Sequence, residues 1–161
     1  MLPFPMRLSW ETETTVRHLT CHREVARSLS RIFDAIWTHF GGDIGKIRAA
    51  GMDLLGGCYN YRPRRNGSGL SMHAWGAAID FDPDHNGLRA VRPDAITPEV
   101  CAIPKAIVEI FKAEGWSWGG DWDAPYDPMH FEATTRPHVE TVTGEDYKPE
   151  PAKSKKEKHA A

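Results

Sequence analysis

The sequence lacks the features that mark several common classes of protein. It has no apolar run long enough to span a bilayer, and its first ten residues, MLPFPMRLSW, lack the continuous apolar core of a secretory signal. The net charge is only −2, so no strong overall field attracts nucleic acid or an anionic membrane. We therefore expect a protein made in the cytoplasm, with neither nucleic acid nor a membrane as its partner.

Cysteine is also scarce. Cys21, Cys58 and Cys101 lie far apart and form no CxxC pair, and three cysteines cannot all be bridged within one chain. Because free cysteine is among the most frequently buried residues, we interpret these three as small buried side chains of a reduced protein.

The length and composition predict one globular domain. A chain of 161 residues, 40% of them hydrophobic, is long enough for a core but short for two domains. Residues 148–161, KPEPAKSKKEKHAA, contain no apolar side chain larger than Ala, so we expect a disordered, charged tail there. The expected organisation is a catalytic-size domain over residues 1–147 followed by this tail, in a monomer.

Hydrophobic periodicity predicts two helices and three short strands. Apolar residues recur at helical spacing over residues 22–40 and 104–114, and glycine follows each of these runs. The runs CYNYR (58–62), AAIDFD (77–82) and MHFE (129–132) alternate as strands do. The residues between 84 and 98 are interpreted as a loop, in which DPDHNG is a turn rather than a second metal site.

Two of these segments supply side chains that suit catalytic zinc. Such a site needs three His or carboxylate ligands, an open position for water, and a base nearby. The first segment, SMHAWGAAIDFD, places His73 just before a strand and Asp80 on it. The second, DPMHFE, places His130 on another strand with Asp127 three residues earlier.

Taken together, these motifs resemble one family. The pattern S-x-H-x-x-G-x-A-x-D, followed about fifty residues later by D-x-x-H-F-E, is similar to the zinc D,D-carboxypeptidases and L-alanyl-D-glutamate peptidases. That group includes small phage endolysins and D-alanyl-D-alanine dipeptidases. The resemblance spans roughly residues 57–132 and takes in GCYNYR and WSWGGDW.

The resemblance implies both a fold and a set of roles. The fold is an α+β domain, in which a small antiparallel sheet carries the ligands and helices pack on it, as in the Hedgehog signalling domain. His73, Asp80 and His130 would bind Zn²⁺, and Asp127 would be the catalytic acid and base. Arg62 would steady the substrate carbonyl, with Arg64 and Arg65 close enough to compete for that role.

Other polar and aromatic residues near these motifs are candidates for supporting roles. Ser71, Asp82 and Glu132 are expected to orient the ligands. The aromatic loop offers Trp118 and Trp122, together with Arg65, as the lining of a substrate groove, and packing in the core is the alternative for the tryptophans.

The functional expectation follows from these parts. Small size, no secretory signal and Asp rather than Glu at position 127 resemble a phage endolysin that meets the wall through a separate pore protein. We expect hydrolysis of the L-Ala to D-Glu bond of the peptidoglycan stem peptide. The alternatives are a D-alanyl-D-alanine carboxypeptidase or dipeptidase, and a non-catalytic zinc-containing binding domain.

Overall fold

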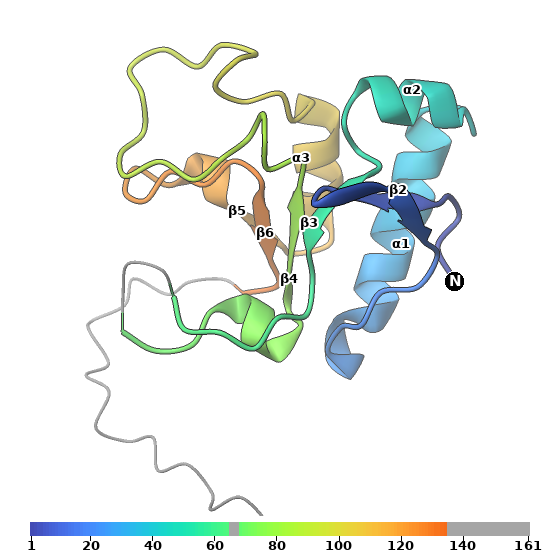
Figure 1. The fold of residues 1–161 in the computed structure, drawn as a ribbon, viewed down its shortest axis with the longest axis horizontal. Helices are drawn as coiled ribbons and strands as arrows, with labels where there is room; N and C mark the ends of the chain where they lie inside the picture. Colours follow the sequence, from blue (N-terminus) through green and yellow to red (C-terminus); the bar gives the residue numbers. More distant parts are fainter. Residues whose placement is uncertain (65–67, 135–161) are drawn as a thin grey trace, which may run out of the picture.

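The structure, a computed structural model, describes residues 1–64 and 68–134 of the chain. It is a mixed α+β fold, as the sequence predicts, with helices packed on a six-stranded sheet (Figure 1). The elements in chain order are β1 (Met6–Leu8), β2 (Glu11–Val16), α1 (Arg23–His39), α2 (Ile44–Ala49), β3 (Leu54–Gly57), η1 (Met72–Trp75), β4 (Ala78–Phe81), α3 (Lys105–Ala113), β5 (Ser117–Trp118), η2 (Gly119–Asp121) and β6 (His130–Glu132).

The sheet has the strand order β2-β1-β3-β4-β6-β5. All neighbouring strands are antiparallel except β1 and β3, which run parallel. The sheet is therefore mostly antiparallel, whereas the expectation was a purely antiparallel one. The hairpin of β1 and β2 was not predicted, because the ETETTV strand exposes most of its side chains and shows little apolar alternation.

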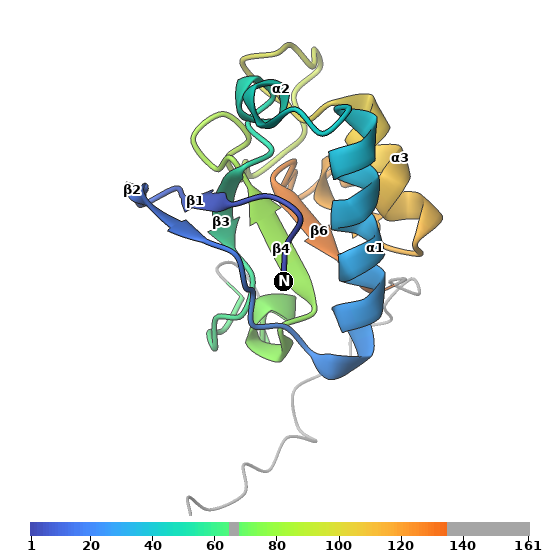
Figure 2. The same cartoon turned by 90° about the vertical axis from the view of Figure 1, so that its right-hand side faces the viewer.

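Both predicted helices are confirmed. Helix α1 begins after His22, whose Nδ1 accepts a hydrogen bond from the Glu24 amide, and it buries Leu29, Ile32, Phe33 and Ile36. Helix α3 begins after Pro104 and buries Ile107, Val108 and Phe111. Figure 2 shows α1 and α3 side by side on one face of the sheet.

Alternation on the central strands separates the core from a polar face. Ile79 and Phe81 of β4 and Phe131 of β6 belong to the core under the helices, where the Phe131 ring stacks 4.0 Å from that of Phe111. Because side chains alternate along a strand, Asp80 and His130 point to the opposite face. The two strands pair in a register that places Asp80 directly across from His130.

The structure differs from prediction after β3. Residues 58–62 were expected to form a strand, but the strand there is Leu54–Gly57 and ends where Gly57 adopts a φ of 147°. Residues 58–62 form no strand, and an isolated bridge joins Pro63 to Leu70. Arg65 and the tail over 148–161 lie outside the described residues, and the domain boundary at 147 stays a prediction.

Within residues 1–64 and 68–134, no helix combines the length and apolar character that crossing a membrane requires.

Candidate metal centre

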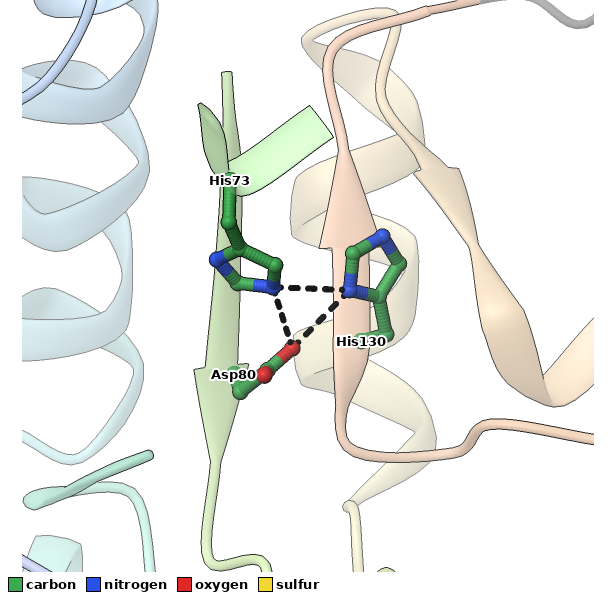
Figure 3. A group of neighbouring side chains, drawn as sticks. All are labelled: His73, Asp80 and His130. Carbon is green, nitrogen blue, oxygen red and sulfur yellow. Dashed lines mark hydrogen bonds and ion pairs between the residues drawn. The ribbon is translucent and has the colours of Figure 1, made fainter. Parts of the chain in front are cut away.

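Three side chains from distant parts of the chain converge on the polar face of the sheet. Asp80 comes from β4, His130 from β6, and His73 from the short helix η1 that precedes β4 (Figure 3). His73 Nε2 lies 3.1 Å from both His130 Nδ1 and Asp80 Oδ1, and the last two atoms are 2.9 Å apart. All three residues are buried. The structure therefore brings together the three predicted ligands.

Backbone contacts fix the orientation of His73. Its Nδ1 lies 2.8 Å from the carbonyl oxygen of Cys58, which can only accept, so Nδ1 carries the proton and Nε2 offers a lone pair. Ser71 caps η1 by accepting from the His73 amide at 3.3 Å, and the Asn60 amide donates to the His73 carbonyl at 2.9 Å. Ser71 thus caps the short helix that carries His73, and its role in orienting a metal ligand stays a prediction.

A carboxylate fixes the orientation of His130 in the same way. His130 Nε2 lies 3.0 Å from Glu132 Oε2, and Thr134 Oγ1 donates to the other oxygen at 3.0 Å. The proton on Nε2 leaves the lone pair of Nδ1 facing Asp80 and His73. Ligating histidines in metal sites commonly carry such a carboxylate partner. Glu132 therefore lies in contact with the cluster, and its role in supporting a bound metal ion stays a prediction.

The cluster is chemically suited to a cation. Two imidazole lone pairs and a carboxylate oxygen point at one another, and without a proton or a metal ion between them they repel. A tetrahedral zinc ion with bonds of about 2.1 Å would place its ligand atoms about 3.4 Å apart. The observed separations of 2.9 to 3.1 Å are a few tenths of an ångström shorter, and the three donor atoms form a group able to hold a metal ion.

The pKa values of His130 and Asp80 also show that the cluster favours a bound positive charge. Burial opposes the charged imidazolium, but the carboxylates of Asp80 and Glu132 raise the pKa of His130 to about 9. Burial also disfavours the Asp80 carboxylate, yet hydrogen bonds to His130 and His73 hold its pKa well below the ordinary value. In the metal-free protein a proton on His130 therefore balances Asp80.

Asp127 lies at the turn that leads into β6. Its carbonyl accepts from the His130 amide at 3.1 Å, and its carboxylate is among the charges that raise the pKa of His130. Its amide donates to the Gly119 carbonyl at 3.0 Å, and a Cβ at Gly119 would overlap the Asp127 backbone. A glycine at 119 thus allows Asp127 to sit beside the ligands.

Two of the predicted arginines, Arg62 and Arg64, precede η1 in the described part of the chain. The Arg62 carbonyl accepts from the Ser71 amide at 3.1 Å, which holds this residue near His73, while its guanidinium lies 3.5 Å from the Pro63 carbonyl. Arg64 is occupied with the Leu70 carbonyl at 3.2 Å. Both guanidinium groups thus lie against a backbone carbonyl, and the assignment of the substrate-binding role to Arg62 stays a prediction.

The two tryptophans of the aromatic loop lie in different places. The Trp122 ring is 5.5 Å from the His130 ring, so it borders the cluster. Trp118 pairs with Phe131 in the sheet register, packs with the core, and donates from Nε1 to the Pro128 carbonyl at 2.8 Å. This corrects the expectation that Trp118 lines a groove. Because Trp118 lies opposite Phe131 in the sheet, its side chain is on the face of the sheet that the helices cover.

Asp82 does not continue the polar face of β4. Its φ of 45° takes the residue out of the strand alternation, and its carboxylate accepts from His85 Nδ1 at 2.9 Å. This corrects the expectation that Asp82 orients a ligand. The DPDHNG segment is a turn, as predicted, and Asp82 and His85 stabilise it.

The three cysteines are free thiols, as expected, but only Cys58 is buried, and Cys21 and Cys101 are partly exposed. Burial raises the pKa of Cys58 to about 12, so its thiol stays protonated, and its contribution to the site is the backbone carbonyl that holds His73. That role was missed at the sequence level, since any residue can supply a carbonyl. The sequence WSWGGDW contains Gly119, but nothing in it indicates that this glycine lies against the backbone of Asp127.

Comparison with known proteins supports the resemblance seen in the motifs. A family model described as D-alanyl-D-alanine carboxypeptidase matches residues 64–133, which include all three candidate ligands and Asp127. A search of solved structures gave no match. The matched segment, residues 64–133, is similar to the D-alanyl-D-alanine carboxypeptidase family, and this similarity supports a metal-dependent peptidase that acts on peptidoglycan.

Proposed function

We propose that this protein is a zinc-dependent endopeptidase that cleaves the L-Ala to D-Glu bond of the peptidoglycan stem peptide. The observation that carries the proposal is the buried cluster of His73, Asp80 and His130, in which Cys58 and Glu132 turn both inner nitrogens into acceptors. Such a donor set of two imidazoles and one carboxylate is typical of catalytic zinc.

The roles of the side chains follow from their positions. A zinc ion held by the three ligands would act as a Lewis acid and lower the pKa of a water molecule. Asp127 would accept a proton from the attacking water and then deliver it to the departing amine of D-Glu. Arg62, anchored through its backbone to Ser71, would donate to the substrate carbonyl oxygen as negative charge develops there.

The endopeptidase assignment rests on Asp127, because the shorter acid resembles the endolysin-type members and not the dipeptidases. It supports the further proposal that the protein is a phage-type endolysin, which meets the wall after release from the cell. The description of the matched family favours a second candidate, a D-alanyl-D-alanine carboxypeptidase, which would use the same ligands.

The test is digestion of purified peptidoglycan with the zinc-loaded protein, followed by mass spectrometry of the released ends. We expect new D-Glu amino termini, loss of cleavage with a chelator, and recovery on adding zinc. Asp127→Asn, loaded with zinc to the same level, is the matched inactive control.

The other outcomes separate the alternatives. Release of free D-Ala without D-Glu termini would replace the proposal with the carboxypeptidase. No cleavage by a protein that binds one zinc ion per chain would instead favour a binding domain.

A further inference from the structure

A cavity of about 480 Å³ lies beside the strand that neighbours the ligand strand β4. Three segments line it: the β1–β2 hairpin, residues 18–20, and β3 with the residues that follow it, as far as Asn60. None of these segments falls within the matched residues 64–133. The volume is within the range of about 300–1,000 Å³ that is usual for small-molecule sites.

The cavity shares a wall with the metal centre. Its lining residues Cys58 and Asn60 are those whose backbones hold His73, and its lining residue Gly57 pairs with Asp80 across the sheet. Figure 2 shows the β1–β2 hairpin projecting away from α1 and α3. By strand alternation, Asp80 and His130 also point away from the core that these helices cover. A substrate bound at the cluster can therefore extend toward this cavity.

The lining is aromatic and polar but carries no strong charge. None of the described lining residues is Asp, Glu, Lys or Arg. Trp10 and Tyr59 are 65% and 54% exposed, so their rings are accessible to a ligand, and His18, Thr20 and Asn60 offer groups that form hydrogen bonds. Apolar surface comes from Leu8, Val16, Leu19 and Leu55.

These features match one part of the proposed substrate better than the others. Beyond the L-Ala to D-Glu bond the stem peptide carries carboxylate and amino groups, which require charged partners when they are buried. Before the bond, L-Ala is joined through a lactyl group to an N-acetylated sugar. That sugar ring is uncharged, presents C–H faces that stack on aromatic rings, and carries hydroxyl and amide groups that form hydrogen bonds.

We propose that this cavity binds the N-acetylated sugar of the glycan strand to which the stem peptide is attached. The inference rests on the proposed function, because it takes the bond next to L-Ala as the one at the metal centre. The β1–β2 hairpin then acts as a specificity element, and Trp10 at its turn provides the stacking surface for the sugar.

The first test measures binding without cleavage. N-acetylmuramyl-L-alanine keeps the sugar but lacks the scissile bond, and N-acetyl-L-alanine lacks the sugar as well. We expect the first compound to bind the zinc-loaded protein at least about tenfold more tightly in calorimetry, because a well-placed aromatic contact contributes about that much. Trp10→Ala should remove this difference, whereas Val91→Ala, which alters an equally exposed residue outside the cavity lining, should keep it.

The second test compares cleavage of a muramyl peptide and of the same peptide with a simple N-acetyl group. The expected kcat/KM ratio is about ten or more in the wild type, and near one in Trp10→Ala. Equal binding and equal cleavage of both compounds by the wild type would overturn the inference and leave the proposed function standing. Preferential sugar binding without any cleavage at L-Ala would keep the inference and overturn the proposed bond.

Discussion

At the scale of single residues, the proposed mechanism assigns metal binding and proton transfer to different side chains. We predict that Asp127→Asn retains one zinc ion per chain but lowers kcat by about 10²- to 10⁴-fold, because the amide cannot accept the proton. Metal analysis and a peptidoglycan assay on the same sample measure both quantities. Asp123→Asn changes an exposed carboxylate in the same loop and should keep full activity. Near wild-type turnover in Asp127→Asn would remove this residue from the mechanism.

The carboxylate behind His130 gives a second prediction at this scale. Glu132→Gln keeps the size of the side chain but removes the charge that lies 3.0 Å from His130 Nε2. Loss of such a partner typically weakens metal binding by about 10- to 100-fold, and competition with a chelator would measure this change. Glu109→Gln, on the exposed face of α3, is the control. An unchanged zinc affinity in Glu132→Gln would show that Nδ1 needs no such support.

At the scale of secondary-structure elements, an ion pair fastens the N-terminal hairpin to the sheet. Arg7 of β1 binds the fully buried Asp53, just before β3, through two hydrogen bonds of 2.6 and 2.9 Å. Arg48 approaches the same carboxylate at 3.4 Å, from a half-exposed position. We predict that Arg7→Met lowers the free energy of unfolding by about 3 kcal/mol, because it leaves a buried charge without its main partner.

Arg48→Met is the matched control, and it should cost less than about 1 kcal/mol. Denaturant unfolding of both variants measures the difference. Equal losses in the two variants would mean that the pair at β1 does not hold the hairpin.

At the scale of the whole molecule, the buried cluster links stability to pH and to metal. His130 has a pKa of about 9 in the metal-free folded protein, compared with about 6.5 when unfolded. The folded state therefore binds the extra proton more tightly. The resulting stabilisation is fully present below about pH 6.5 and is lost as the pH rises through about 9.

We therefore predict that the melting temperature of chelator-treated protein falls between pH 6.5 and 9. The increase produced by added zinc should grow over the same range, because the metal displaces this proton. Thermal unfolding at several pH values with and without zinc would measure both trends. If the melting temperature of metal-free His130→Gln falls with pH as steeply as that of the wild type, the pH dependence belongs to other groups.

Much of the fold could be predicted from local patterns. Helices α1 and α3 and strands β4 and β6 follow from apolar periods in segments that lie against the core. The hairpin was missed because its second strand is mostly exposed, and the strand expected over 58–62 was wrong because alternating aromatics there are exposed loop residues. Periodicity reports burial, so it fails where an element has no buried face.

The sequence by itself indicated which residues form the candidate site, because His73, Asp80, Asp127 and His130 stand in two short motifs, SMHAWGAAIDFD and DPMHFE. Only the tertiary structure decided how they are held. The register of β4 and β6, the Cys58 carbonyl behind His73, and the turn of Trp118 toward the core all depend on which strands pair. Any residue type can supply a backbone carbonyl or pair with a distant strand. Such contacts therefore cannot be read from the sequence and become known only from the folded structure.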